Sequence, residues 1–137
     1  ETSSKEIILV SDNDKNKIKI QRSAEMIYGL RNFIGNAIKF SKSTVEIRVK
    51  SDPKNLEVLI NDDGPGFPKD IKEIIGEPYI KSKSDEVSSN SGTGLGTFLG
   101  KTFLERKSAN LFFFKDTKLG GACVQIIWDV QNLKLNV

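Results

Sequence analysis

Gly92-Thr93-Gly94-Leu95-Gly96 is the stretch that decides the fold, together with Asp62-Asp63-Gly64-Pro65-Gly66, which begins thirty residues earlier. Each stretch is a glycine-rich loop next to a segment with the pattern of a strand or a helix. Glycine allows backbone conformations and close approaches that other residues resist. Two such loops in one small, mildly basic chain predict a nucleotide-binding site.

The loop at 92–96 matches neither of two common phosphate-binding motifs. A Walker A loop has four residues between its first glycine and Gly-Lys-Thr, whereas Gly100-Lys101-Thr102 follows Gly96 after three residues and Gly94 after five. A Rossmann fingerprint that begins at Gly94 needs glycine at position 99, where the chain has Leu99. We therefore expect a different architecture around the phosphates.

Length and composition are those of a globular domain. The chain has 137 residues, of which 37% are hydrophobic and 28% charged, and this predicts one domain over residues 1–137. No run approaches the ~18 apolar residues of a membrane span, and no apolar signal region is present. Because the chain starts at Glu1 without Met, we expect a fragment of a longer protein.

Charge and residue usage exclude several classes of site. The net charge of +3 favours an anionic ligand, but without the basic clusters of a nucleic-acid binder no nucleic-acid partner is expected. The chain has no histidine, which excludes a histidine base and histidine metal ligands. A bound metal would need oxygen ligands, which favours Mg²⁺ or Ca²⁺. The single cysteine, Cys123, stands in an apolar run and is interpreted as a buried hydrophobe.

The hydrophobic pattern predicts alternating strands and helices. Ser23 can cap a helix that runs to Phe40, with one apolar stripe formed by Ile27, Leu30, Ile34, Ala37 and Ile38. Runs at 7–10 and 17–20 predict a hairpin. Further strands are expected at 44–50, 56–60, 111–114 and 123–130, with helices at 69–75 and 95–107 and a long polar loop at 76–94. This order predicts an α/β two-layer sandwich, a mixed sheet with helices on one face.

Two asparagines in the first helix suggest a metal site. At ~100° per residue, Asn32, Asn36 and Lys39 fall on one face, with Phe40 beside it, opposite the apolar stripe. Asparagine is a poor residue inside a helix, and amide oxygens suit a hydrated Mg²⁺ next to nucleotide phosphates. The alternative is the ordinary polar face of an amphipathic helix.

The glycine loops have functional and plain interpretations. Asp62 ends a strand and could accept a hydrogen bond from an exocyclic amine such as that of adenine, with Gly64 and Gly66 making room for a flat ring. The loop at 92–96 opens a helix, whose first amides attract phosphate, and Lys81 and Lys83 could reach phosphate oxygens. Each feature alone could also be a turn or a solvated loop.

Taken together, the motifs resemble those of sensor histidine kinases. Leu30-Arg31-Asn32-Phe33-Ile34-Gly35-Asn36-Ala37-Ile38-Lys39-Phe40 resembles their N box, Asp62-x-Gly64-x-Gly66 their G1 box and Gly92–Gly96 their G2 box. The chain from about Ile7 to Trp128 resembles their catalytic ATP-binding domain, of the gyrase, Hsp90, histidine kinase and MutL superfamily. That resemblance implies the Bergerat ATP-binding fold with a mobile ATP lid at about 79–91.

Additional stretches resemble the RegB/PrrB redox-responsive branch of these kinases. They are Gly76-Glu77-Pro78-Tyr79-Ile80, Gly94-Leu95-Gly96-x-Phe98, Leu104-Glu105-Arg106 and Gly120-Gly121-Ala122. Two features are departures: Gly100-Lys101 is unusual within that helix, and Ala122 replaces the threonine that is common after these glycines in other histidine kinases. Cys123 does not correspond to the redox-active cysteine of that branch.

The resemblance implies a role for each matched residue. Asn36 would coordinate Mg²⁺, Asn32 and Lys39 would support the metal and the phosphates, and Asp62 would accept from the adenine amine. The others would surround the ATP: Phe40 at the nucleoside, Gly64 and Gly66 at the purine, Pro78 and Tyr79 in the F box, Lys83 in the lid, and Gly92, Thr93, Gly94, Leu95 and Gly96 at the phosphates.

The implied activity is transfer of the γ-phosphoryl group of Mg-ATP to a histidine on a separate dimerisation domain, which then serves a response regulator. ATP-hydrolysing members of the superfamily carry a glutamate base where this chain has Asn32, and losing such a base commonly lowers a rate by about 10²–10⁴-fold. The domain would be the cytoplasmic part of a membrane-anchored sensor, with no membrane contact of its own. The alternatives are an anti-sigma-type protein serine kinase and a non-catalytic ATP-binding module.

Overall fold

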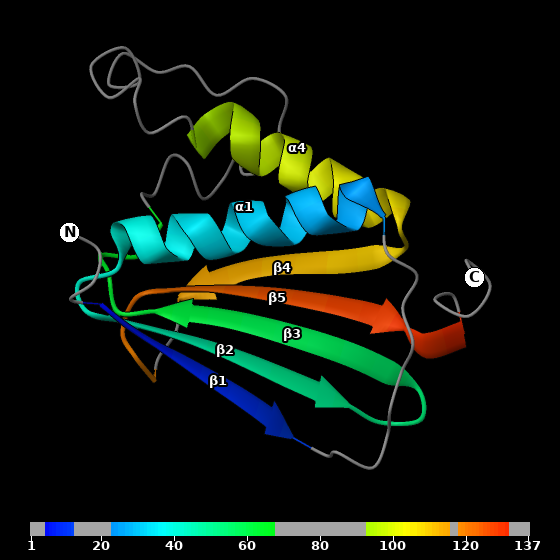
Figure 1. Cartoon of the computed structure of the whole chain (residues 1–137), viewed down its shortest axis with the longest axis horizontal. Coiled ribbons are helices and arrows are strands. Elements are labelled where there is room, and N and C mark those ends of the chain that lie inside the picture. The colour runs from blue at the N-terminus through cyan, green and yellow to red at the C-terminus, as the bar shows by residue number, and fades with distance from the viewer. Residues whose placement is uncertain (1–4, 13–22, 68–92, 116–117, 132–137) are drawn as a thin grey trace.

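The computed structural model describes residues 5–12, 23–67, 93–115 and 118–131. The strands in these residues are β1 (Glu6–Asp12), β2 (Thr44–Ser51), β3 (Asn55–Asp62), β4 (Ala109–Lys115) and β5 (Ala122–Asp129). They form one sheet in the order β1-β2-β3-β5-β4. β1 pairs with β2 in parallel and the other neighbours are antiparallel. The helices α1 (Ala24–Phe40) and α4 (Thr93–Arg106) lie on the same side of this sheet (Figure 1). The predicted two-layer α/β sandwich is confirmed.

Local signals define α1 as the sequence predicted. The side chain of Ser23 accepts a hydrogen bond from the Met26 amide at 3.1 Å, which satisfies one of the free amides of the first turn. At the other end the Ser41 amide donates to the Ala37 carbonyl, and Lys5 Nζ donates to the Ile38 carbonyl at 2.7 Å. A cation at the C-terminal end of a helix also interacts favourably with the helix dipole.

The core lies between the sheet and the helices. The sheet contributes alternate residues of its central strands, because successive strand side chains point to opposite faces. The side chains with almost no exposure are Val45, Ile60, Leu104, Ile126 and Trp128. None of the described helices combines the length and the apolarity needed to cross a membrane.

Some predicted elements differ from the structure or fall outside it. β1 was expected in a hairpin with 17–20, but those residues lie outside the described part, and its described partner is β2. The expected helix at 69–75 and most of the loop at 76–94 also lie outside it. The apolar stripe of α1 was placed off-centre, since the buried residues of the helix are Met26, Gly29, Phe33 and Ala37.

The two helices approach each other through glycines. A Cβ at Gly29 would lie 2.5 Å from Cγ of Leu104, and one at Gly100 would lie 3.2 Å from Oδ1 of Asn32. Nearby, the rings of Tyr28 and Phe103 pack edge to face with centroids 5.2 Å apart. This contact explains Gly100, the departure from the kinase pattern noted above, because a larger residue there would press on α1.

We predict that Gly29→Ala destabilises the protein by about 1–3 kcal/mol, because the new methyl group would overlap the fully buried Leu104 side chain. Helix propensity alone would predict a gain of ~1 kcal/mol. Urea unfolding followed by fluorescence of Trp128, the one tryptophan of the chain, measures the change.

Gly35→Ala is the matched control, since a Cβ at this helical position would meet no atom within 4 Å. It should stabilise the protein by about 0.5–1 kcal/mol. If Gly29→Ala stabilised the protein as much as Gly35→Ala, the close packing of α1 on α4 would be wrong.

Candidate nucleotide-binding site

Asp62 lies at the end of β3, and the surrounding backbone holds its carboxylate. Its Oδ1 accepts hydrogen bonds from the Gly64 amide at 2.9 Å and from the Ala122 amide at 3.1 Å. Only 4% of the residue is exposed. These two bonds hold Oδ1 of the carboxylate in one orientation.

Glycines line this carboxylate because no side chain would fit. A Cβ at Gly64 would lie 2.2 Å from the Phe40 carbonyl oxygen, and a Cβ at Gly121 would lie 2.3 Å from Oδ1 of Asp62. At Gly66 the space is open, since a Cβ there would meet nothing within 4 Å, but the φ of +85° favours glycine. The end of α1, the loop after β3 and the start of β5 therefore meet at Asp62.

Asp63 ties the same loop to the segment after α1. It accepts bonds from the amides of Lys42, Ser43 and Thr44 at 2.8–3.2 Å and from the Ser43 hydroxyl at 2.9 Å. Partial burial raises the pKa of Asp63, but these hydrogen bonds outweigh it and lower that pKa to about 2. This role could not be predicted from the sequence, where Asp63 looked like part of a glycine turn.

Asn32 and Asn36 come together, but not on an open polar face. Asn36 Nδ2 lies 3.4 Å from Oδ1 of Asn32 and 3.4 Å from Oγ1 of Thr97, a residue of α4. Both asparagines are half-buried. Both lie opposite the apolar stripe, which packs against the core as predicted, but α4 covers that side of α1, so it is not an open polar face. Among the described residues no hydrogen bond reaches Oδ1 of Asn36, so this oxygen suits a hard cation.

Lys39 and Phe40 form the exposed end of the α1 site. The ammonium of Lys39 lies 5.4 Å from the centroid of the Phe40 ring, within the range of a cation–π contact. The Phe40 residue is 41% exposed. The ring is exposed at the end of α1, and the Phe40 carbonyl lies close to Gly64, so this end of the helix offers a surface on which a nucleoside could pack.

The phosphate-binding residues are described only in part. Thr93, Gly94, Leu95 and Gly96 form the first turn of α4, and this turn carries no acidic residue, so its free amides suit an anion. Gly92, Tyr79 and Lys83 lie outside the described residues. Within the described part no three acidic or cysteine residues cluster to hold a metal.

Comparisons with known proteins agree with the motifs. A family described as histidine kinase-, DNA gyrase B- and HSP90-like ATPases matches residues 22–132. Sensor histidine kinase RegB of Cereibacter sphaeroides is 36% identical over 135 residues, which cover 88% of this chain and 29% of RegB. Sensor histidine kinase CpxA of Escherichia coli is 27% identical over 99 residues, covering 72% of this chain and 21% of CpxA.

Solved structures agree on the fold. The mycobacterial sensor histidine kinase MprB aligns with a TM-score of 0.72 at 21% identity, over 93% of this chain and 85% of MprB. The nucleotide-free catalytic domain of histidine kinase ThkA aligns with a TM-score of 0.72 at 19% identity, over 92% of this chain and 80% of that structure. The resemblance to sensor histidine kinases, and to RegB among them, is thereby confirmed.

We predict that Asp63→Asn lowers the free energy of unfolding at pH 7 by about 1–2 kcal/mol, because the hydrogen bonds from 42–44 lose their charged acceptor. The folded pKa lies below the ordinary 3.8, so the contribution of the ionised group is full above pH ~4 and fades as the pH falls through about 2. By pH 3 roughly half of the difference between the two proteins should be gone. Urea unfolding at both pH values measures it, and a difference that grows on acidification would contradict the assignment.

Proposed function

Because the chain belongs to the family of histidine kinase-, DNA gyrase B- and HSP90-like ATPases, as the catalytic domain of a sensor histidine kinase, we propose that it transfers the γ-phosphoryl group of Mg-ATP to a histidine of a separate domain. ATP binding follows from the family. The residue roles, the metal and the acceptor are the proposal. The observation that carries it is the buried Asp62 carboxylate, held by two backbone amides where three motif-bearing segments meet.

The purine would bind at Asp62. Its carboxylate accepts from the adenine amine, while Gly64 and Gly66 keep the pocket clear of side chains and Phe40 packs on the nucleoside. The orientation of Asp62 is set before the ligand arrives, because Gly64 and Ala122 already hold one carboxylate oxygen. Preorganisation of this kind favours affinity and selectivity.

The metal and the phosphates would lie along α1 and the start of α4. Oδ1 of Asn36 would hold Mg²⁺, which neutralises phosphate charge, with Asn32 fixing the orientation of the Asn36 amide. Lys39 would approach the phosphates from the end of α1. Lys83 and the backbone of Gly92, Thr93, Gly94, Leu95 and Gly96 would complete the phosphate site.

The side chains position and stabilise rather than attack. Phosphoryl transfer needs in-line positioning and charge stabilisation more than covalent help from the protein. Asn32 stands where ATP-hydrolysing relatives in the superfamily use a glutamate base, and a neutral amide cannot take a proton from water near pH 7. ATP would therefore be held for a better nucleophile, a neutral imidazole.

That imidazole would come from another part of a longer protein. The chain contains no histidine, and it spans 29% of RegB and 21% of CpxA. We propose that residues 1–137 are one catalytic domain working in the cytoplasm. A histidine-bearing dimerisation domain of the same protein would be the acceptor, and a response regulator would receive the phosphoryl group next.

We predict that Asp62→Asn weakens ATP binding by about 1–3 kcal/mol, because one carboxylate oxygen becomes an amide that repels the adenine amine. The remaining oxygen can still accept from Gly64 and Ala122, so the pocket should keep its shape. GTP binding should change far less, since guanine has a carbonyl where adenine has an amine. Calorimetry with both nucleotides measures this.

Asp62→Ala is the matched control, because it removes the adenine contact and the two backbone hydrogen bonds together. It should lower stability as well as ATP affinity, whereas Asp62→Asn should change mainly affinity. Equal ATP affinity for Asp62→Asn and the wild type would contradict the adenine pocket.

We predict that the isolated domain hydrolyses ATP slowly and does not label itself with γ-³²P-ATP, because it has neither a glutamate at 32 nor a histidine acceptor. Added to the dimeric helical domain of its own full-length protein, it should produce an acid-labile, alkali-stable label on that partner. An acid-stable label on serine would instead support an anti-sigma-type serine kinase, and rapid release of inorganic phosphate without the partner would contradict the role of Asn32.

A further inference from the structure

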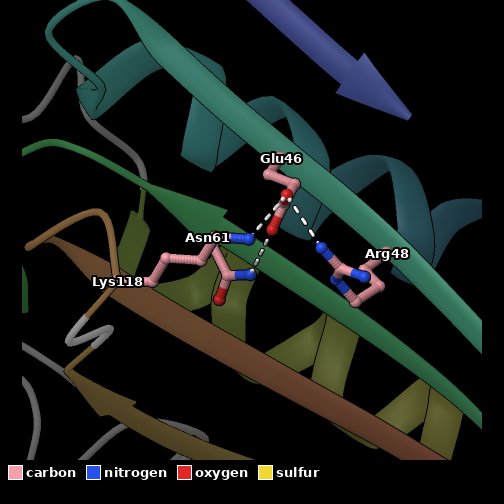
Figure 2. A network of polar contacts seen from close by, with 4 residues as sticks. All are labelled: Glu46, Arg48, Asn61 and Lys118. Atoms are coloured by element: carbon pink, nitrogen blue, oxygen red, sulfur yellow. Dashed lines mark hydrogen bonds and ion pairs between the residues drawn. The ribbon is translucent and has the colours of Figure 1, made fainter. Parts of the chain in front are cut away.

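A buried carboxylate lies on the far side of the sheet from the helices, behind the candidate site. Glu46 is on β2 between Val45 and Ile47, which face the helical core, and only 6% of the residue is exposed. Its Oε2 lies 3.2 Å from both Nη2 of Arg48 and Nζ of Lys118, and Asn61 Nδ2 donates to Oε1 at 3.4 Å (Figure 2). The motifs of the nucleotide site account for none of these four residues.

This cluster is joined to the site through the backbone on both sides. Asn61 directly precedes Asp62 and pairs with Glu46 across the β2–β3 ladder. Lys118 lies in the turn that leads to Gly121 and Ala122, where the Ala122 amide bonds to Asp62. Lys118 therefore connects β2 to the turn that completes the Asp62 pocket.

The turn that leads to Gly121 and Ala122 has little room to move where it packs on Asp62 and Gly64. Gly120 has a φ of +92°, and a Cβ at Gly121 would lie 2.4 Å from the Asp62 carbonyl oxygen and 2.7 Å from the Gly64 nitrogen. The backbone thus packs directly on the loop after β3. A small displacement of this turn would lengthen the Ala122 bond and release the Asp62 carboxylate.

The state of Glu46 fits an ion pair. Burial raises the pKa of its carboxyl, but hydrogen bonding and charge from Lys118 and Arg48 outweigh burial and lower the pKa overall. A buried carboxylate that loses one cation partner is destabilised more than an exposed one. Arg48 lies on β2 itself, whereas Lys118 lies in the turn, so of these two cations Lys118 is the one whose bond to Glu46 links the turn to β2.

We infer that Glu46 and Lys118 are positioning residues that hold the Gly121–Ala122 backbone against Asp62 and thereby set the affinity for adenine nucleotides. The inference rests on the proposed role of Asp62. Glu46 and Lys118 lie on the face of the sheet away from the helices, so they would affect nucleotide affinity without touching the nucleotide.

The test compares Lys118→Met with Arg48→Met, because each removes a cation at 3.2 Å from the same carboxylate oxygen. ATP and inosine triphosphate, which lacks the amine, are titrated by calorimetry. Lys118→Met should raise the Kd for ATP by roughly three- to tenfold and leave that for inosine triphosphate unchanged. Arg48→Met should leave both within about twofold, and Lys118→Arg should restore wild-type affinity.

Hydrogen exchange of the Ala122 amide without nucleotide gives a second readout. It should be faster in Lys118→Met and unchanged in Arg48→Met. Equal loss of affinity in the two Met variants, equal loss for both nucleotides, or unchanged Ala122 exchange in Lys118→Met would overturn the inference. If the wild type itself does not prefer ATP to inosine triphosphate, the role of Asp62 fails first, and the inference fails with it.

Discussion

One carboxylate oxygen organises this domain. Oδ1 of Asp62 accepts the amides of Gly64 and Ala122, residues far apart in the chain, and the surrounding backbone is too close for a side chain at Gly64 or Gly121. A buried carboxylate needs such partners, since burial without them is costly. The same bonds that satisfy Asp62 also bring the end of α1, the loop after β3 and the start of β5 to one point, which is where we place the adenine.

Much of this arrangement could be predicted from the sequence. Ser23 and the helical periodicity defined α1, the alternation in β2 and β3 defined strands, and the three motifs pointed to the family that the comparisons then supported. These signals are local, or they depend on residue types that the fold cannot replace. The boundaries of α4, β4 and β5 differed from the expected ones by one to two residues at each end, where helices and strands commonly fray.

Other features could not be predicted, because they depend on which elements become neighbours. Helical geometry placed Asn32 and Asn36 away from the apolar stripe, but the packing of Gly29 against Leu104 brings α4 over them. Asp63 looked like a turn residue until the backbone of 42–44 lay beside it. Glu46 looked like a solvated position of a half-buried strand, and only the structure shows that its carboxylate is buried and paired with Arg48 and with the exposed Lys118.

We propose that Asp62 is oriented to accept the adenine amine before the nucleotide binds. A structure of this domain with Mg²⁺ and a non-hydrolysable ATP analogue tests it most directly. We expect the exocyclic amine of adenine within about 2.7–3.2 Å of Asp62, with the Gly64 and Ala122 bonds unchanged. A well-ordered analogue whose adenine lies elsewhere, or an Asp62 carboxylate that turns away from both amides to meet it, would contradict the claim.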